Sequence, residues 1–254
     1  MSKYVEMRGV KIGEGMPKIC VPVAEKTLED ISKSLNGLLS ASFDLVEWRV
    51  DHFEEAFDEK EVLNALELIR EKLSDKPLLF TFRTAKEGGE KDITPEKYLE
   101  LISAAIVSDL VDAVDVEVFM GDEIVSEIVC HAHEKGVVVI ASNHDFDKTP
   151  SKDVIVKRLC KMQSLGADIP KIAVMPNTKK DVLVLLEATE EMVREHADRP
   201  VITMSMSGDG VISRLCGEVF GSALTFGTAG KASAPGQIDS GKLSSVLSII
   251  HESL

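Results

Sequence analysis

The sequence predicts an α/β fold, a (β/α)8 TIM barrel preceded by a short N-terminal β-hairpin. Eight short apolar runs alternate with longer helix-like segments, and a strand–helix unit recurs about every 32 residues, the period of such a barrel. The chain has 254 residues, which suits a barrel that forms one domain, so residues 1–254 are expected to be a single catalytic domain. An open, doubly wound sheet is the alternative. Against it, residues 22–26, the first strand–helix turn, lack a glycine-rich phosphate motif.

The first half of the chain begins with residues 4–17, a preface in which glycines mark turns. Apolar runs that are only long enough for strands then alternate with helix signals. Thr27 and Asp30 have the spacing of an N-cap and its capping-box partner, and Thr94 followed by Pro95 marks another helix start. The expected elements are strand 18–23, helix 27–39, strand 43–50, helix 59–73, strand 78–83, a helix from Thr94, and strand 113–119.

The second half continues the same alternation. Gly136 and Gly166 each follow a helix-like segment, the position at which glycine commonly ends a helix. The expected elements are helix 122–135, strand 137–143, helix 151–165, strand 169–175, helix 180–195, strand 201–206, a short helix at 211–219, strand 222–226 and helix 240–252.

The net charge of −14 argues against a nucleic-acid-binding or anionic-membrane surface, because both need an excess of Lys and Arg. Residues 1–15 have no apolar core of the kind that a signal peptide needs, and the longest apolar runs are too short to span a bilayer. A cytoplasmic protein with no nucleic-acid or membrane partner is therefore expected. The four cysteines contain no CxxC pair, so they are expected to be free thiols rather than zinc ligands.

Chemistry in this fold collects at the carboxyl ends of the strands and in the loops that follow them. Arg49, Arg83, Arg214, Lys171 and His144 occupy such positions, and together they form the local basic island that an anionic substrate needs. Further side chains at these ends and loops are Glu47, Glu87, Asp115, Glu117, Met204, Met206, Phe226, Ser233 and Gln237.

Several of these residues also have a structural interpretation. Glu47 and Arg49 lie two apart on one strand face and could form an ion pair inside the barrel. Asp115 and Glu117 are expected to pair with arginines rather than to bind a metal. His144, taken alone, is more often a satisfied structural histidine.

Lys171 lies inside the apolar run 169–175, where an unpaired ammonium group is costly to bury. A neutral, desolvated lysine is a good nucleophile toward a carbonyl carbon and forms a Schiff base. The structural alternative is a lysine that pairs with a carboxylate or extends to solvent. His144 lies on the neighbouring strand, within reach of the same substrate carbon, which favours the catalytic interpretation.

Motifs around these residues are spread over nearly the whole chain. They are Gly13-Glu14-Gly15-Met16-Pro17-Lys18, Phe43-Asp44-Leu45-Val46-Glu47-Trp48-Arg49-Val50-Asp51, Phe80-Thr81-Phe82-Arg83, Ser142-Asn143-His144-Asp145-Phe146, Ile169-Pro170-Lys171-Ile172-Ala173-Val174, Gly210-Val211-Ile212-Ser213-Arg214 and Ser233-Ala234-Pro235-Gly236-Gln237. With these motifs the sequence resembles type I 3-dehydroquinate dehydratase. The resemblance implies a (β/α)8 barrel, usually a homodimer, and dehydration of 3-dehydroquinate to 3-dehydroshikimate in the shikimate pathway of aromatic amino-acid biosynthesis, without cofactor or metal.

Carried over by position, Lys171 matches the imine-forming lysine, His144 the general acid/base, and Glu87 the carboxylate that orients the histidine. Arg214 matches the residue that clamps the substrate carboxylate. The matches to other substrate-binding residues are Glu47, Arg49, Arg83, Ser233 and Gln237, with Met204, Met206 and Phe226 as apolar pocket walls. Pro22 departs from the pattern, because some members of the family have a serine there that contacts substrate.

The implied chemistry fits these residue types. A protonated imine supplies the electron sink that proton removal beside a ketone requires, and Lys171 must lose its proton before it attacks the ketone carbon. His144 can remove a proton and return it to the departing hydroxyl on the same face, which predicts syn elimination. The loop that ends at Gln237 could act as a lid.

Three alternatives remain open on the sequence. A class I aldolase would share the barrel and Lys171, but it usually needs a phosphate site in the glycine-rich loops after the last two strands. A metal-dependent barrel would use Asp115, Glu117 and His144. A non-catalytic binding module would have no reason to retain Lys171, His144 and Arg214 together.

Overall fold

The computed structural model describes residues 4–38, 41–229 and 236–254. Its strands are β1 (Val5–Met7), β2 (Val10–Ile12), β3 (Lys18–Val23), β4 (Leu45–Arg49), β5 (Leu78–Thr81), β6 (Ala113–Glu117), β7 (Val138–Asp145), β8 (Ile169–Val174), β9 (Ile202–Ser205), β10 (Leu224–Thr228) and β11 (Ile238–Asp239). Its α-helices are α1 (Leu28–Leu38), α2 (Glu59–Leu73), α3 (Pro95–Val107), α4 (Asp122–Glu134), α5 (Lys152–Ser164), α6 (Lys179–Glu191), α7 (Val211–Leu215), α8 (Gly217–Phe220) and α9 (Ser240–His251).

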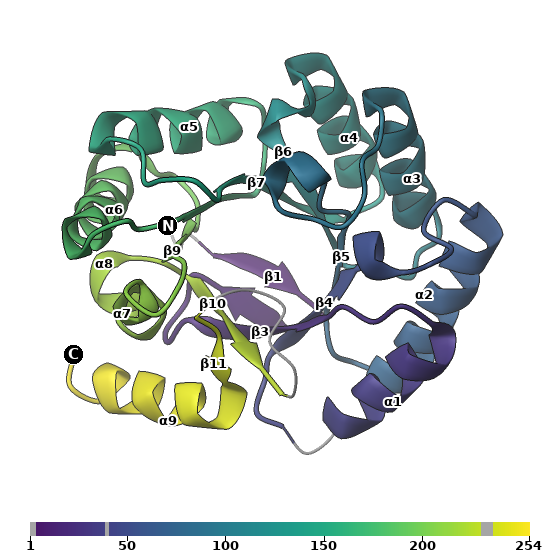
Figure 1. The fold of residues 1–254 in the computed structure, drawn as a ribbon, viewed down its shortest axis with the longest axis horizontal. Helices are drawn as coiled ribbons and strands as arrows, with labels where there is room; N and C mark the ends of the chain where they lie inside the picture. Colours follow the sequence, from purple (N-terminus) through teal and green to yellow (C-terminus); the bar gives the residue numbers. More distant parts are fainter. Residues whose placement is uncertain (1–3, 39–40, 230–235) are drawn as a thin grey trace.

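The parallel strands form a closed barrel with the helices outside it (Figure 1). Neighbouring strands pair in sequence order from β3 to β9, and β10 returns to pair with β3. A parallel bridge between Val201 and Ser222 joins the chain at β9 to the chain at β10. Residues 4–17 contain the antiparallel pair β1–β2. The predicted (β/α)8 barrel with a hairpin preface is therefore confirmed.

The predicted strands and helices match the observed ones, with differences at their ends. The predicted helix 180–195 ends as an α-helix at Glu191 and continues as the π-helical segment η4 (Met192–His196). The predicted short helix 211–219 is divided at Cys216 into α7 and α8. Strand β7 continues to Asp145 and so includes His144, whereas the sequence predicted an end at residue 143.

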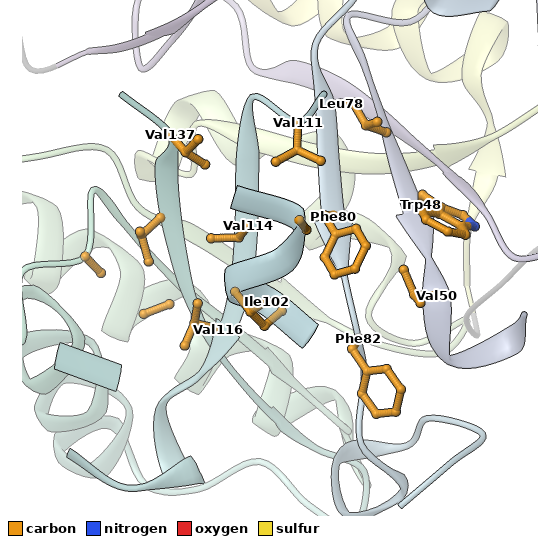
Figure 2. Packing of buried hydrophobic residues seen from close by; sticks show 14 of the residues in the cluster. Trp48, Val50, Leu78, Phe80, Phe82, Ile102, Val111, Val114, Val116 and Val137 are labelled. Atoms are coloured by element: carbon orange, nitrogen blue, oxygen red, sulfur yellow. The ribbon is translucent and has the colours of Figure 1, made fainter. Parts of the chain in front are cut away.

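Buried apolar side chains fill two layers, because successive residues of each strand point to opposite faces. The outer layer lies between strands and helices, where Trp48 packs edge-on against Phe80 with ring centroids 5.7 Å apart. Figure 2 shows this layer, with Phe80 on β5, Phe82 just after the end of β5, and Val114 on β6. The residues between them on each strand, including Glu47 and Arg49, therefore face the barrel interior.

The hairpin β1–β2 closes the amino-terminal end of the barrel. Met7 and Ile12 are buried and pack with inward-facing residues near the start of the barrel strands, such as Leu45 and Leu79. Figure 1 shows β1 crossing the centre of the ring of strands. The interior is thus filled at one end, and the functional pocket lies at the other.

Candidate active site

A pocket of about 230 Å³ lies at the carboxyl ends of the barrel strands. It is lined by Glu47, Arg49, Arg83, Glu87, Gly88, His144, Phe146, Lys171, Ala173, Met204, Met206, Arg214, Phe226 and Gln237. These include every predicted site residue that the structure describes. Ser233, the remaining one, lies outside the described residues.

Strand register sets the depth of the two central residues. On the paired strands β7 and β8, Ser142 lies opposite Lys171, and His144 lies opposite Ala173. His144 is therefore two residues nearer the mouth than Lys171, and both side chains line the pocket. Lys171 is reached through the barrel interior, and only 3% of the residue is exposed.

Lys171 makes an ion pair with a fully buried carboxylate. Its Nζ lies 2.8 Å from Oδ2 of Asp115 and 3.8 Å from Oε1 of Glu47. The same Nζ is 4.7 Å from the ring centroid of Phe226. Lys171 thus pairs with a carboxylate, as the structural alternative predicted. It also lines the pocket, as the catalytic interpretation requires.

Asp115 receives three donors. Besides Lys171, the Nη2 of Arg83 donates to Oδ1 at 2.7 Å, and Oγ of Ser142 donates to the same oxygen at 2.6 Å. Burial alone would raise the pKa of Asp115, but the charges of Arg83 and Lys171 outweigh it and lower the pKa below its usual value. Asp115 is consequently a fixed negative charge beside Lys171.

Arg83 links the acidic residues of β6 to the pocket. Its Nη1 donates to Glu117 at 2.9 Å, in addition to the bond from Nη2 to Asp115. The prediction that Asp115 and Glu117 pair with arginine is therefore confirmed. Across residues 4–38, 41–229 and 236–254, no group of three or more His, Cys, Asp or Glu side chains is placed to hold a metal ion.

Arg49 forms its ion pair with Asp51, through two hydrogen bonds of 2.8 Å each. The proposed structural pairing of Glu47 with Arg49 is wrong, because the Asp51 carboxylate takes the Arg49 guanidinium. Glu47 instead accepts a hydrogen bond from Thr81 at 2.9 Å and faces Lys171.

Glu87 holds His144 by its backbone and its ring. Oε2 of Glu87 accepts from the backbone N of His144 at 2.8 Å and lies 2.9 Å from its Nδ1. Burial and the nearby Glu117 raise the pKa of Glu87 to about 7. Burial, followed by the charges of Arg83 and Lys171, lowers the pKa of His144 well below its usual value. His144 is therefore neutral at neutral pH and can accept a proton.

Arg214 lies on α7, in the segment after β9, and is almost fully buried. Its Nη1 is 3.7 Å from Sδ of Met204. Burial lowers the pKa of Arg214 to about 10, which leaves a cation at neutral pH. A charge in this apolar surrounding suits an anionic substrate group that enters the pocket.

Sequence reasoning missed several residues of the site. Ser142 and Asn143 bond to the central acids, and Phe146 and Gly88 line the wall. Gly88 has φ +85°, and a Cβ there would lie 2.3 Å from Cε2 of Phe146, so the chain passes too close for a side chain. Each of these residues lies within two positions of His144 or Glu87 in the sequence, and this closeness could have identified them.

Comparison with known families gives one clear match. The family model for type I 3-dehydroquinase matches residues 19–254. The 3-dehydroquinate dehydratase of Clostridioides difficile (strain 630) is 58% identical over 254 residues, 100% of both chains. That of Salmonella typhimurium (strain LT2) is 57% identical over 250 residues, covering 98% of this chain and 99% of the relative. In the described part of the chain, no helix has the length and apolarity needed to cross a membrane.

Solved structures agree with the sequence matches. The type I 3-dehydroquinate dehydratase of Clostridium difficile with covalently modified comenic acid superposes with a TM-score of 0.97 at 57% identity, covering 100% of both chains. The 3-dehydroquinate dehydratase of Geobacillus kaustophilus HTA426 gives 0.95 at 37% identity, covering 98% of this chain and 97% of that one. These findings confirm the resemblance seen in the motifs. The chain belongs to the type I 3-dehydroquinase family.

Proposed function

We propose that this chain dehydrates 3-dehydroquinate to 3-dehydroshikimate in the shikimate pathway, through an imine on Lys171. The observation that carries the assignment to residues is the buried amino group of Lys171 in one pocket with His144 and Arg214. The reaction itself follows from membership of the type I family. A class I aldolase reaction has no comparable support.

Imine formation begins with the amino group of Lys171. The ammonium group of Lys171 gives a proton to the neutral imidazole of His144, and the neutral Nζ then attacks the carbonyl carbon to form a carbinolamine. The imidazolium returns this proton to the carbinolamine hydroxyl, which leaves as water. Loss of water leaves a protonated imine. Because Asp115 stays ionised, its carboxylate lies next to positive nitrogen both before and after this step.

His144 carries out the proton transfers of the elimination. As a neutral imidazole it removes the proton from the carbon next to the imine, and the electrons move into an enamine. The imidazolium then gives its proton to the hydroxyl that leaves from the same face, and water departs in a syn elimination. Hydrolysis of the resulting imine frees the product and Lys171.

Glu87 orients His144 and stabilises the imidazolium that forms between the two transfers. Arg214 clamps the substrate carboxylate with its two-pronged guanidinium group. The remaining assigned contacts with substrate come from Glu47, Arg49, Arg83, Ser233 and Gln237, with Met204, Met206 and Phe226 as apolar walls.

The wider organisation is part of the same proposal. Residues 1–254 act as one catalytic domain, the enzyme is a cytoplasmic homodimer, and its reaction needs no cofactor. Sedimentation equilibrium tests the dimer by its mass, and activity after treatment with a chelator tests the absence of a metal requirement.

Borohydride reduction in the presence of 3-dehydroquinate tests the mechanism. The expected result is a covalent adduct that peptide mass mapping places on Lys171 and that Lys171→Ala lacks. Turnover should appear as new conjugated-enone absorbance. Near-native turnover by Lys171→Ala would refute the imine route, and turnover of a sugar phosphate with none of 3-dehydroquinate would point to the aldolase alternative.

A further inference from the structure

A chain of hydrogen bonds connects the outer helix α5 with His144. Arg158 on α5 donates from Nη1 to Oδ1 of Asn143 at 2.8 Å. Nδ2 of Asn143 donates to Oε1 of Glu87 at 3.0 Å, and the other oxygen of Glu87 lies 2.9 Å from Nδ1 of His144. Asn143 is buried, whereas the side chain of Arg158 is 25% exposed. The chain of bonds thus runs from the protein surface to the pocket.

Arg158 determines the direction of both hydrogen bonds that the Asn143 amide makes. A guanidinium group can only donate, so Arg158 requires the carbonyl oxygen of the Asn143 amide. The amide nitrogen must then point the other way, toward Glu87. Without Arg158, the amide could rotate and present its oxygen to the carboxylate, which would replace an attraction by a repulsion.

We propose that Arg158 is a positioning residue for the dehydration, acting through Asn143 on the Glu87–His144 pair. The inference rests on the proposed function, because it assigns Arg158 a part in the proton transfers of His144. Arg158 is not among the residues that line the pocket, so its proposed effect on the substrate is indirect.

Arg158 is held in place by two further groups. Its guanidinium carbon lies 5.6 Å from the ring centroid of Phe119, and its Nη1 lies 3.6 Å from Oδ2 of Asp145. Lys161, one turn further along α5, lies 6.0 Å from the same ring and pairs with Asp122 at 2.6 Å. Lys161 therefore shares the helix, the charge and the aromatic contact of Arg158, which makes it a matched control.

Besides these hydrogen bonds, several charged groups act on Glu87 and His144. Arg83 lies 3.7 Å from Glu87 and Glu117 raises the Glu87 pKa, while Arg49, Arg83, Lys171 and Asp115 act on His144. These groups are present in every variant described below, so a shift between variants reports the bond that was removed. Loss of the donor from Asn143 makes the Glu87 carboxylate less favourable, which raises the pH at which Glu87 takes up a proton.

The test compares Arg158→Met, which keeps an apolar stem, with Lys161→Met. For Arg158→Met we expect kcat at pH 7 to fall about fivefold and the acid limb of the kcat profile to move up by about half a pH unit, with KM within about twofold. Arg158→Lys, which retains a donor, should restore part of the rate. Lys161→Met should match the unmodified enzyme, and thermal unfolding checks that each variant is folded.

Asn143→Asp changes the middle residue of the same series of hydrogen bonds. It keeps the acceptor for Arg158 but places a second carboxylate beside Glu87, so the acid limb should move further up than in Arg158→Met. Asn143→Leu removes both the acceptor for Arg158 and the donor to Glu87, so in the double variant with Asn143→Leu the Arg158→Met change should add almost nothing, because both act through one bond. An acid limb that stays in place in Asn143→Asp would overturn the inference even where Arg158→Met folds poorly.

An unchanged profile in Arg158→Met, equal changes in Arg158→Met and Lys161→Met, or additive effects in the double variant would each overturn the positioning role. Borohydride trapping separates this outcome from failure of the proposed function. If the unmodified enzyme forms no adduct on Lys171, the proposed function fails. If it forms the adduct while Arg158→Met keeps the original profile, only the inference about Arg158 fails.

Discussion

Lys171 and Asp115 form a buried ion pair across the barrel interior, with Nζ and Oδ2 2.8 Å apart and Asp115 fully inaccessible to solvent. In the proposed reaction the lysine nitrogen is positive as an ammonium and again as a protonated imine, so the carboxylate favours both states. The neutral amine between them is the state that Asp115 disfavours. Asp115 therefore stabilises the resting enzyme and the electron sink with one charge.

Asp115→Asn removes that charge and leaves Arg83 and Lys171 without their shared carboxylate. The free energy of unfolding should fall by on the order of 3 kcal/mol, because one partner of a buried ionic cluster is lost. kcat should fall about 100-fold, since the protonated imine loses its counter-charge. Denaturant unfolding and steady-state kinetics measure the two effects.

Asp112→Asn is the control for this prediction. Asp112 pairs with Arg70 at 3.0 Å and precedes β6, at the end of the strand away from the pocket. It should lower stability while leaving the rate of adduct formation unchanged. Equal rates of adduct formation in Asp115→Asn and Asp112→Asn would contradict a role for Asp115 in the imine chemistry.

Glu87→Gln should raise stability at alkaline pH while reducing activity. The folded-state pKa of Glu87 is raised to about 7, so its contribution to stability is complete below its unfolded pKa and is lost as pH rises through 7. Glu87→Gln has no carboxyl group to ionise, so it avoids this loss of folding free energy, which amounts to about 3 kcal/mol at most. Its melting temperature should therefore exceed that of the unmodified enzyme by several degrees at pH 8.

The same comparison at pH 4.5 supplies the control, because there the folded protein already carries a neutral Glu87. The gain in melting temperature should then be much smaller. A gain that is equal at both pH values would show that packing, and not ionisation of Glu87, causes it.

Arg214→Lys should raise KM for 3-dehydroquinate with a smaller effect on kcat. Lysine keeps the charge but cannot make two parallel hydrogen bonds to a carboxylate, so KM should increase about tenfold to 100-fold. Arg194→Lys is the matched control, because Arg194 is exposed, pairs with Glu190 and does not line the pocket. An unchanged KM in Arg214→Lys would remove Arg214 from carboxylate binding.

Gly88→Ala should reduce both stability and activity. The backbone at Gly88 has φ +85° and any Cβ would collide with Phe146, so we expect a loss of about 2 kcal/mol in the free energy of unfolding. Displacement of Phe146 and the adjacent Glu87 should lower kcat as well. Thermal unfolding and initial rates provide the measurements.

Gly37→Ala is the opposite case in the same chain. Gly37 lies inside α1, and a Cβ there would meet no atom within 4 Å. This substitution should stabilise the protein by about 0.5–1 kcal/mol through helix propensity and leave activity unchanged. Similar losses from both glycine substitutions would contradict the account given for Gly88.

Much of the barrel could be predicted because its wall is built from continuous apolar runs of strand length. The run at 169–175 illustrates this, since it coincides with β8 to within one residue. β11 was missed because two residues carry no periodic pattern. The π-helical turn after Glu191 was missed because its side-chain spacing differs little from that of an α-helix.

The membership of the pocket was predictable, whereas the partners within it were not. Parity along a strand places Glu47 and Arg49 on the inner face, which the sequence alone reveals. The pairing of Arg49 with Asp51 depends on the 3-10 turn Val50–His52 that follows β4, and the pairing of Lys171 with Asp115 depends on how distant segments meet. Lys171 and Asp115 are 56 positions apart, and the strand β7 lies between their strands.

Because Met7 and Ile12 of the hairpin β1–β2 fill the amino-terminal end of the described barrel, substrate, product and water enter and leave through the opposite end. The proposed reaction releases water when the imine forms and again in the elimination, and it consumes water when the imine is hydrolysed. Substrate or product occupies the mouth throughout this sequence. A water molecule released inside the barrel, either when the imine forms or in the elimination, can therefore be the one that later hydrolyses the product imine.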